Sequence, residues 1–178
     1  DGSLLNRGGV LVKSSKLLLI SMLILSWLTL PLLGKNALKK YLPSGIFISF
    51  LTKFLDKFGE RKKWWRFYKG ISPLDSMDFF NFGPYFATSV WMLKLFYGKF
   101  WVFLVSNTIL QIVFIYFGLK YVKRLRILSL VFLTKFQYLV IDMFRAVLLY
   151  SFQWAKDQLM LSIKDIQTKR TFYNEGNS

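Results

Sequence analysis

Residues 101–119 read WVFLVSNTILQIVFIYFGL, a stretch of 19 residues without a charged side chain. An α-helix rises about 1.5 Å per residue, so a helix of this length covers about 28 Å. The hydrocarbon core of a bilayer is about 30 Å thick. The stretch therefore predicts a transmembrane helix.

The composition of the whole chain agrees with a lipid environment. Of its 178 residues, 54% are hydrophobic and 19% are aromatic. A soluble domain of this size has too little interior to hide so much apolar surface. We therefore expect a single all-α integral membrane domain, with about four transmembrane helices and one interfacial amphipathic helix.

The other candidate spans are three further apolar runs, at residues 17–33, 79–97 and 127–154. The first is at the short end of what crosses a bilayer. The segment Gly34–Ala37 that follows it lacks the small-residue pattern of a signal-peptide cleavage site, so we expect a retained helix. In the second run, Gly83-Pro84 predicts a kink or a delayed helix start. The third run leads into a polar tail, 155–178, for which we expect only a short, fraying extension of the helix.

Residues 42–69 follow a different pattern, in which apolar side chains recur every three or four positions with charges between them. This is typical of an amphipathic helix, and its uncharged part is too short to span a bilayer. The segment ends in a cluster of cations around a pair of tryptophans, which membrane headgroup regions favour: Arg61, Lys62, Lys63, Trp64, Trp65, Arg66 and Lys69. We expect a helix on the membrane surface whose cluster contacts anionic lipid headgroups, with packing against another protein as the alternative.

The distribution of cations also predicts an orientation. The segment 35–69 holds ten Lys and Arg and the loop 120–126 holds four, whereas the remaining loops and tails hold eight. If four helices cross, these two segments lie on one side. The positive-inside rule places that side in the cytoplasm or organelle matrix, with both termini outside. If 17–33 does not cross, the N-terminus moves inside.

The last apolar run carries a stripe of polar side chains on one helix face, formed by Lys135, Tyr138, Asp142 and Arg145. Asp142 and Arg145 are three residues apart and can pair. A charge near the bilayer centre costs at least about 2.5–3.5 kcal/mol, so such residues normally face protein or water. Asn107 and Gln111, four residues apart in the 101–119 helix, are the expected interhelical partners.

Two hypotheses explain this stripe. In the functional one, it lines a proton or ion pathway or a ligand pocket. In the structural one, which we favour, Asp142 and Arg145 neutralise each other and hold helices or a partner subunit together. The structural hypothesis predicts that exchanging Asp142 and Arg145 is tolerated better than alanine at either position.

The composition of the chain argues against metal binding, redox chemistry and nucleic-acid binding. The chain has no Cys and no His, which excludes disulfides, thiolate chemistry and the usual zinc and haem ligands. Asp75 and Asp78 could hold Mg²⁺, but a helix cap and a favourable helix-dipole contact explain them better. The net charge of +16 could suit nucleic acid, but the cations lie at the ends of candidate spans, which favours a membrane surface. We expect no cofactor, no metal and no nucleic-acid partner.

These observations predict a non-enzymatic integral membrane protein that acts as an accessory or interaction subunit of a larger membrane complex. The main alternative is a small transporter or channel component that uses the polar stripe. A lipid-modifying enzyme built on Asp75 and Asp78 is the third hypothesis, and none of the common enzyme motifs occurs. The expected partners are anionic membrane lipids and other membrane subunits or further copies of the chain. The expected location is a bacterial plasma membrane or an organellar inner membrane.

Overall fold

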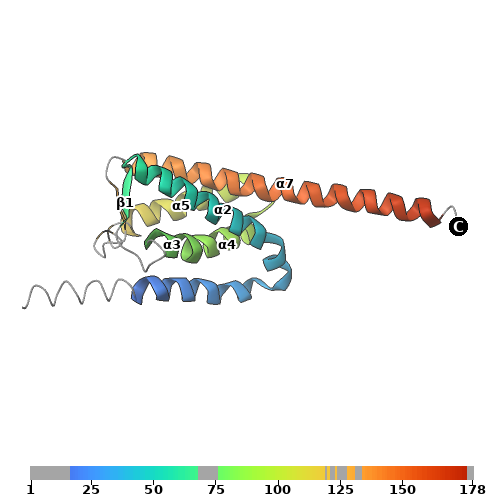
Figure 1. Ribbon diagram of the computed structural model, residues 1–178, viewed down its shortest axis with the longest axis horizontal. Helices are drawn as coiled ribbons and strands as arrows, with labels where there is room; N and C mark the ends of the chain where they lie inside the picture. The colour runs from blue at the N-terminus through green and yellow to red at the C-terminus, as the bar shows by residue number, and fades with distance from the viewer. Residues whose placement is uncertain are drawn as a thin grey trace, which may run out of the picture.

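The computed structural model describes residues 17–67, 76–118, 120, 123, 128–130 and 134–175. Within these ranges the protein is a helical bundle with one short two-stranded ribbon (Figure 1). The elements are a first helix Leu17–Leu33 whose last turn is the 3-10 segment η1 (Leu30–Leu33), α2 (Lys35–Arg61), β1 (Trp65–Phe67), α3 (Ser76–Phe80), the π-helical turn η2 (Asn81–Tyr85), α4 (Phe86–Phe96), α5 (Phe100–Val113), the π-helical turn η3 (Phe114–Gly118), β2 (Leu128–Leu130) and α7 (Lys135–Glu175).

Two tight connections make consecutive helices run in opposite directions. Gly34 has a φ of 81° and joins the first helix to α2, and Gly98 has a φ of 93° between α4 and α5. Glycine adopts these left-handed conformations without the steric penalty that a Cβ atom brings. The helices therefore alternate in direction across the bundle, and α7 continues far beyond the others, as Figure 1 shows.

The predicted helix at 42–69 has the wrong bounds. α2 begins at Lys35 and ends at Arg61, where Lys63 takes a φ of 58° and the chain enters β1. A helix of 27 residues is about 40 Å long, so Lys35 and Arg61 lie at opposite ends of the bundle rather than on one side of it. α2 packs lengthwise against α4 and α7.

The predicted last span also differs from the observed helix. α7 begins at Lys135 instead of residue 127, because residues 128–130 form β2. It then runs without interruption to Glu175, so the polar tail is the second half of one 41-residue helix.

The Gly83-Pro84 kink occurs where the sequence predicts it. Gly83 has non-helical angles, φ −103° and ψ −106°, inside η2. Proline removes a main-chain donor and opens the helical hydrogen-bond ladder. The amide of Phe86, which would donate to Phe82 in a regular α-helix, donates to the carbonyl of Asn81. The carbonyl oxygen of Phe82 accepts a hydrogen bond of 2.8 Å from the indole Nε1 of Trp27, which belongs to the first helix. The kink therefore ties the first helix to the bundle.

The strands join two segments that are far apart in the sequence. β1 and β2 pair antiparallel, with Trp65 opposite Leu130 and Phe67 opposite Leu128. This ribbon lies at the end of the bundle where α2 ends and α7 begins. We call this end the basic end. Three exposed cations, Arg61, Lys62 and Lys63, lie where α2 ends, and two more exposed cations, Lys120 and Lys123, stand between η3 and β2 in the sequence.

Polar and apolar side chains are distributed in an unusual way. The interior holds an apolar core that includes Ile48, Val90, Leu93, Phe103 and Leu149, but it also holds charged and amide side chains. The outer surface carries many large apolar side chains, including Phe50, Phe54, Phe58, Trp101, Ile109, Phe117, Phe136 and Phe144. Soluble proteins rarely expose so much contiguous apolar surface.

The all-α class is confirmed, and one helix carries the support for a membrane location. The helix Phe100–Gly118 is the described segment that is long and apolar enough to cross a membrane, and it nearly coincides with the predicted span 101–119. Only 11% of it is buried in the bundle, whereas the core helix of a soluble protein would be mostly buried.

Candidate functional site

The centre of the candidate site is Arg145 on α7, which lies between two carboxylates. Its Nη1 donates to Oδ1 of Asp142 at 3.1 Å, the pairing that their spacing predicts, and its Nη2 donates to Oδ1 of Asp56 at 2.9 Å. The side chains of Asp142 and Arg145 are 2% exposed and that of Asp56 is 6% exposed. Buried charges are tolerated only when they are paired and hydrogen-bonded. This geometry pairs all three charges, while Oδ2 of Asp142 accepts no hydrogen bond from the described residues.

A third helix segment completes this cluster. The amide Nδ2 of Asn81, in η2, donates to Oδ2 of Asp56 at 2.7 Å. The main-chain oxygen of Asn81 accepts a bond of 3.2 Å from Oγ of Ser49. We call Asp56, Asn81, Asp142 and Arg145 the ion cluster; it connects α2, η2 and α7.

The ion cluster lies nearer the basic end than the middle of the bundle. Asp142 follows the first residue of α7 by seven positions, and Asp56 precedes the last residue of α2 by five. At about 1.5 Å per residue, the cluster lies about 7–10 Å inside this end. It also lies close to the ion pair of Lys53 and Asp78, in which Nζ and Oδ1 are 3.0 Å apart.

Of the two aspartates considered for Mg²⁺, Asp78 is buried and binds Lys53. Asp75 lies outside the described residues. Within the part of the chain that the structure describes, no group of three or more His, Cys, Asp or Glu side chains is arranged to hold a metal ion.

The predicted polar stripe of α7 divides into an inner and an outer part. Tyr138, Asp142 and Arg145 are buried, whereas Lys135 is exposed at the start of the helix. The Nζ atom of Lys135 lies 4.9 Å from the ring centroid of Tyr116, so the lysine contacts an aromatic face at the basic end.

The predicted partners on α5 lie near Asp142 but do not make the main interhelical contact. The Nδ2 of Asn107 donates to the carbonyl of Phe103 in its own helix at 2.9 Å. Asn107 and Gln111 border a small cavity that Asp142 also borders. The ion pair to another helix goes to Asp56, which the sequence argument had placed on a membrane surface.

The sequence of α2 contains a pattern that could have predicted the burial of Asp56. The face that α2 buries consists mainly of small and polar side chains at helical spacing, among them Gly45, Ser49, Thr52, Asp56 and Gly59. Small residues at such spacing let membrane helices approach closely. The opposite face exposes Ile46, Phe50, Phe54 and Phe58. α2 is therefore amphipathic, as predicted, but its small and polar side chains face the interior and its large apolar side chains face outward.

The basic cluster predicted to contact headgroups lies at the bundle end. Arg61, Lys62 and Lys63 are exposed. Trp64 is half-buried with its ring edge-on to Phe58 at 5.8 Å. Trp65 and Arg66 belong to β1, and Lys69 lies outside the described residues.

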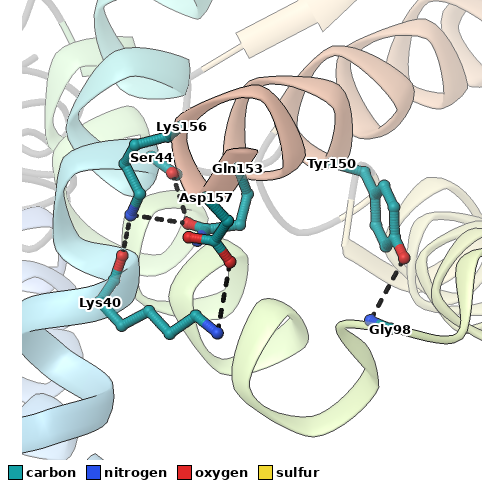
Figure 2. Close-up of polar contacts among 7 residues, drawn as sticks. All are labelled: Lys40, Ser44, Gly98, Tyr150, Gln153, Lys156 and Asp157. Atoms are coloured by element: carbon teal, nitrogen blue, oxygen red, sulfur yellow. Dashed lines mark hydrogen bonds and ion pairs between the residues drawn. The ribbon is translucent and has the colours of Figure 1, made fainter. Parts of the chain in front are cut away.

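A second polar cluster fixes α7 to α2 at the other end of the bundle (Figure 2). The side chain of Gln153 accepts from Oγ of Ser44 at 2.7 Å and donates to Oδ1 of Asp157 at 2.8 Å. Asp157 also pairs with Lys40 at 3.3 Å, and Lys156 donates to the main-chain oxygen of Lys40. Burial lowers the pKa of Lys156 below its usual value. We call these five residues the exit cluster, because α7 leaves the bundle immediately after them.

A cleft opens beside the ion cluster, between η2, α5 and α7. Its volume is about 320 Å³, and its polar floor includes Asn81, Gln111, Asp142 and Arg145. Its walls include the rings of Phe80, Tyr85, Phe114, Phe117 and Tyr138. Volume and lining fall within the range of small-molecule sites, which are largely apolar with a few convergent polar groups.

No protein-family model, curated protein or solved structure matches this chain. The functional argument therefore depends on the geometry described above.

Proposed function

We propose that this protein is an integral membrane subunit, without enzymatic activity, that binds another subunit of a membrane complex. The observation that carries the proposal is the second half of α7, which projects from an apolar-surfaced bundle and has no partner among the described residues (Figure 1).

The membrane part of the proposal follows from the distribution of side chains. Four charged side chains and two amides are buried in the interior, while many aromatic and aliphatic side chains are exposed on the outside. Lipid contact on the outer surface explains this arrangement, because intramembrane charges face protein and not lipid. The apolar surface of α2 suggests that α2 crosses with the other helices, which gives five crossings instead of four plus a surface helix.

Orientation follows from the cations. The observed bounds of α2 divide the cations of 35–69 between two ends, because Lys35, Lys39 and Lys40 lie at its start and Arg61 at its end. In sequence, the connections 61–75 and 119–134 together hold nine Lys and Arg, whereas 34–40 and 97–99 together hold four. The positive-inside rule therefore still favours the cytoplasm or organelle matrix for the basic end.

The exposed cations Arg61, Lys62 and Lys63 at the basic end suit contact with anionic headgroups at about 1 kcal/mol per cation. A bacterial plasma membrane or an organellar inner membrane fits this orientation, with the projecting half of α7 on the opposite side.

The projecting half of α7 has the features of a docking helix. Every residue from 158 to 171 is exposed. Leu159, Ile163 and Ile166 recur at helical spacing on one face, which forms an apolar stripe. An isolated helix is marginal in water without packing, so a partner that covers this stripe would stabilise it. The exit cluster fixes the direction in which the helix leaves the bundle.

The test is extraction of the tagged protein from its native membrane in mild detergent, followed by identification of the chains that co-purify. We expect a discrete partner that is lost when Ile163 is replaced by Gln. Leu161→Gln is the matched control, because Leu161 is exposed on the opposite face of the same helix. Retention of the same partner by Ile163→Gln, or loss in both variants, would contradict docking through the stripe.

The cleft is the observation that favours the second candidate, a small transporter or channel component. Transport through the polar stripe requires a path that reaches Asp142, and the cleft borders this residue. Single cysteines are clean reporters in this chain, which has none of its own. Labelling of Gln111→Cys by a membrane-impermeant thiol reagent would support transport, and labelling confined to the bundle ends would support the subunit function.

A further inference from the structure

The cleft between η2, α5 and α7 opens on the helix that is best suited to contact lipid. Its rim includes Leu110, Val113 and Phe117, which recur at helical spacing and are 39%, 51% and 68% exposed. They belong to Phe100–Gly118, the described segment that is long and apolar enough to cross a membrane. A ligand of this cleft would therefore enter it from the hydrocarbon of the bilayer.

The lining of the cleft favours an apolar ligand. Asn81, Asp142 and Arg145 at its floor are only 1%, 4% and 2% exposed, so a ligand meets almost none of their polar surface. The hydroxyl of Thr88, another lining residue, donates to the main-chain oxygen of Pro84 at 2.6 Å. The accessible lining is mostly apolar, and an apolar ligand that fills it gains dispersion contacts that an empty cleft lacks.

The dimensions of the cleft suit a chain better than a helix. Its lining residues extend over 110–118 on one side and 138–145 on the other, so it follows the helix axes for about 10–12 Å. An α-helix with its side chains is about 10 Å wide, so 10 Å of helix would fill about 800 Å³. The volume of the cleft is about 320 Å³, which is too small for a helix of a partner protein.

Exposed cations lie where the cleft reaches the basic end. Gly118 and Tyr138, which belong to the basic end of η3 and of α7, both line the cleft. Lys135 is exposed one turn before Tyr138, and its Nζ atom lies 4.9 Å from the ring centroid of Tyr116. Lys120 is exposed two residues beyond Gly118 in the sequence. An apolar chain in the cleft would thus have its polar end beside lysines, which attract an anionic group.

We propose that the cleft binds one acyl chain of an anionic phospholipid, whose phosphate contacts Lys135. The chain lies along α5 and α7 between the aromatic walls, and the headgroup lies outside the cleft at the basic end. The inference rests on the membrane location in the proposed function, but it does not depend on the partner of α7.

The test uses phosphatidylglycerol with a photoreactive diazirine in one acyl chain, added at low mole fraction to the full-length protein in phosphatidylcholine nanodiscs. After irradiation, mass spectrometry identifies the labelled residues. We expect labelling to concentrate on the lining residues of 110–118 and 138–145, and an excess of unlabelled phosphatidylglycerol to reduce it at least fivefold. Labelling spread evenly over exposed apolar side chains elsewhere, such as Phe50 and Trp101, would overturn the proposal.

A variant that fills the cleft tests where the chain binds. Val113→Trp adds bulk from the half-exposed rim without changing any member of the ion cluster, and it should lower labelling of the cleft at least fivefold. Val105→Trp is the matched control, because Val105 is 55% exposed on the same helix and does not line the cleft. Equal labelling of the cleft in folded Val113→Trp and in Val105→Trp would overturn the proposal.

A variant that leaves the packing intact tests the phosphate contact. Lys135→Gln removes one exposed charge, so about fivefold more unlabelled phosphatidylglycerol should be needed to halve the labelling of the cleft. Lys164→Gln, on the exposed projecting half of the same helix, should leave this competition unchanged. Equal competition in the two variants would overturn the contact of the phosphate with Lys135.

Failure of this inference can be told apart from failure of the proposed function. Release of the protein from its native membrane by alkaline carbonate would contradict the membrane location on which both rest. A protein that stays in the membrane but shows no saturable labelling of the cleft would overturn the lipid site alone. Cross-links from the cleft to a second copy of the chain, obtained in place of lipid, would likewise overturn it.

Discussion

Arg145 forms ion pairs with two helices at once, and this changes the interpretation of its pairing. The spacing of Asp142 and Arg145 predicts a self-contained pair on one helix, but Asp56 from α2 is a third member. The arginine therefore connects helices and does more than neutralise its neighbour. A planar guanidinium, with several donors in a fixed geometry, is well suited to bridge two carboxylates.

Replacement of Arg145 by Leu should strongly destabilise the protein. It removes the guanidinium that pairs with both buried carboxylates, Asp56 and Asp142, and removal of one member of a buried ion pair costs about 3–5 kcal/mol. The triple variant Asp56→Asn, Asp142→Asn and Arg145→Leu should recover much of this loss. The measurement is the apparent melting temperature in mild detergent, by fluorescence-detected size-exclusion chromatography.

The exposed ion pair of Asp165 and Lys169 supplies the control for this experiment. Asp165→Asn should change stability by less than about 0.5 kcal/mol, because exposed pairs contribute little. A triple variant as unstable as Arg145→Leu alone would show that the charge imbalance is not the cause of the loss.

The structure also reverses the expectation for exchange of Asp142 and Arg145. A two-residue pair would survive the exchange, but an aspartate at position 145 would face Asp56 and an arginine at 142 would lose that partner. We expect the exchanged protein to be no more stable than either single alanine variant in the same melting assay. If the exchanged protein is more stable than both alanine variants, the pair of Asp142 and Arg145 contributes more to stability than the contact with Asp56.

At the scale of the elements, close approach of α2 to α4 gives Asp56 its place inside the bundle. A Cβ atom on Gly45 would lie 2.6 Å from Cγ2 of Val90 and 2.9 Å from Cε2 of Phe86. Only glycine leaves room for the two helices at this distance. The polar face of α2 is consequently brought against α4 and α7.

Gly45→Ala should destabilise the bundle by about 1–3 kcal/mol, the usual cost of overpacking a core. In a double-mutant cycle, Val90→Ala should relieve part of this cost, because it removes the nearest atom. The expected coupling between the two substitutions exceeds about 0.5 kcal/mol. Additive losses would mean that the added methyl group does not meet Val90.

The kink at η2 accepts a hydrogen bond from one indole. Trp27→Phe keeps an aromatic ring but leaves the carbonyl of Phe82 without this side-chain donor. Because the bond is exposed, we expect a loss of about 0.5–1.5 kcal/mol. Trp101→Phe is the matched control, because Trp101 is 74% exposed. Equal melting temperatures of the two variants would show that the hydrogen bond contributes little.

At the scale of the whole molecule, the arrangement of five antiparallel helices predicts which ends share a side of the membrane. A surface helix at 42–69 would keep Lys39 and Lys62 on one side, whereas α2 crossing with the bundle separates them by about 34 Å. Both lysines are exposed.

We expect Lys39→Cys and Lys62→Cys to react with an impermeant thiol reagent from opposite faces of sealed vesicles. Lys99→Cys should react from the same face as Lys39→Cys, since Lys99 and Lys39 lie at the same end of the bundle. Reaction of Lys39→Cys and Lys62→Cys from one face would support the surface helix and contradict crossing by α2.

The sequence by itself determined the properties that depend on composition and local spacing. The charge-free stretch 101–119 predicts the apolar helix that the structure contains, Gly83-Pro84 predicts the kink, and the three-residue spacing predicts contact between Asp142 and Arg145. These features arise within one helix or one turn, so the residues that decide them are neighbours in the chain.

Only the tertiary structure decided which face of α2 is buried and which residues meet Asp142 and Arg145. The 3–4 residue pattern of α2 is the same whether its Phe stripe contacts lipid or core, and the choice depends on packing against α4 and α7. The contact of Asp56 with Arg145 joins residues 89 positions apart. The cleft likewise exists because η2, α5 and α7 meet there, and no single segment contains it.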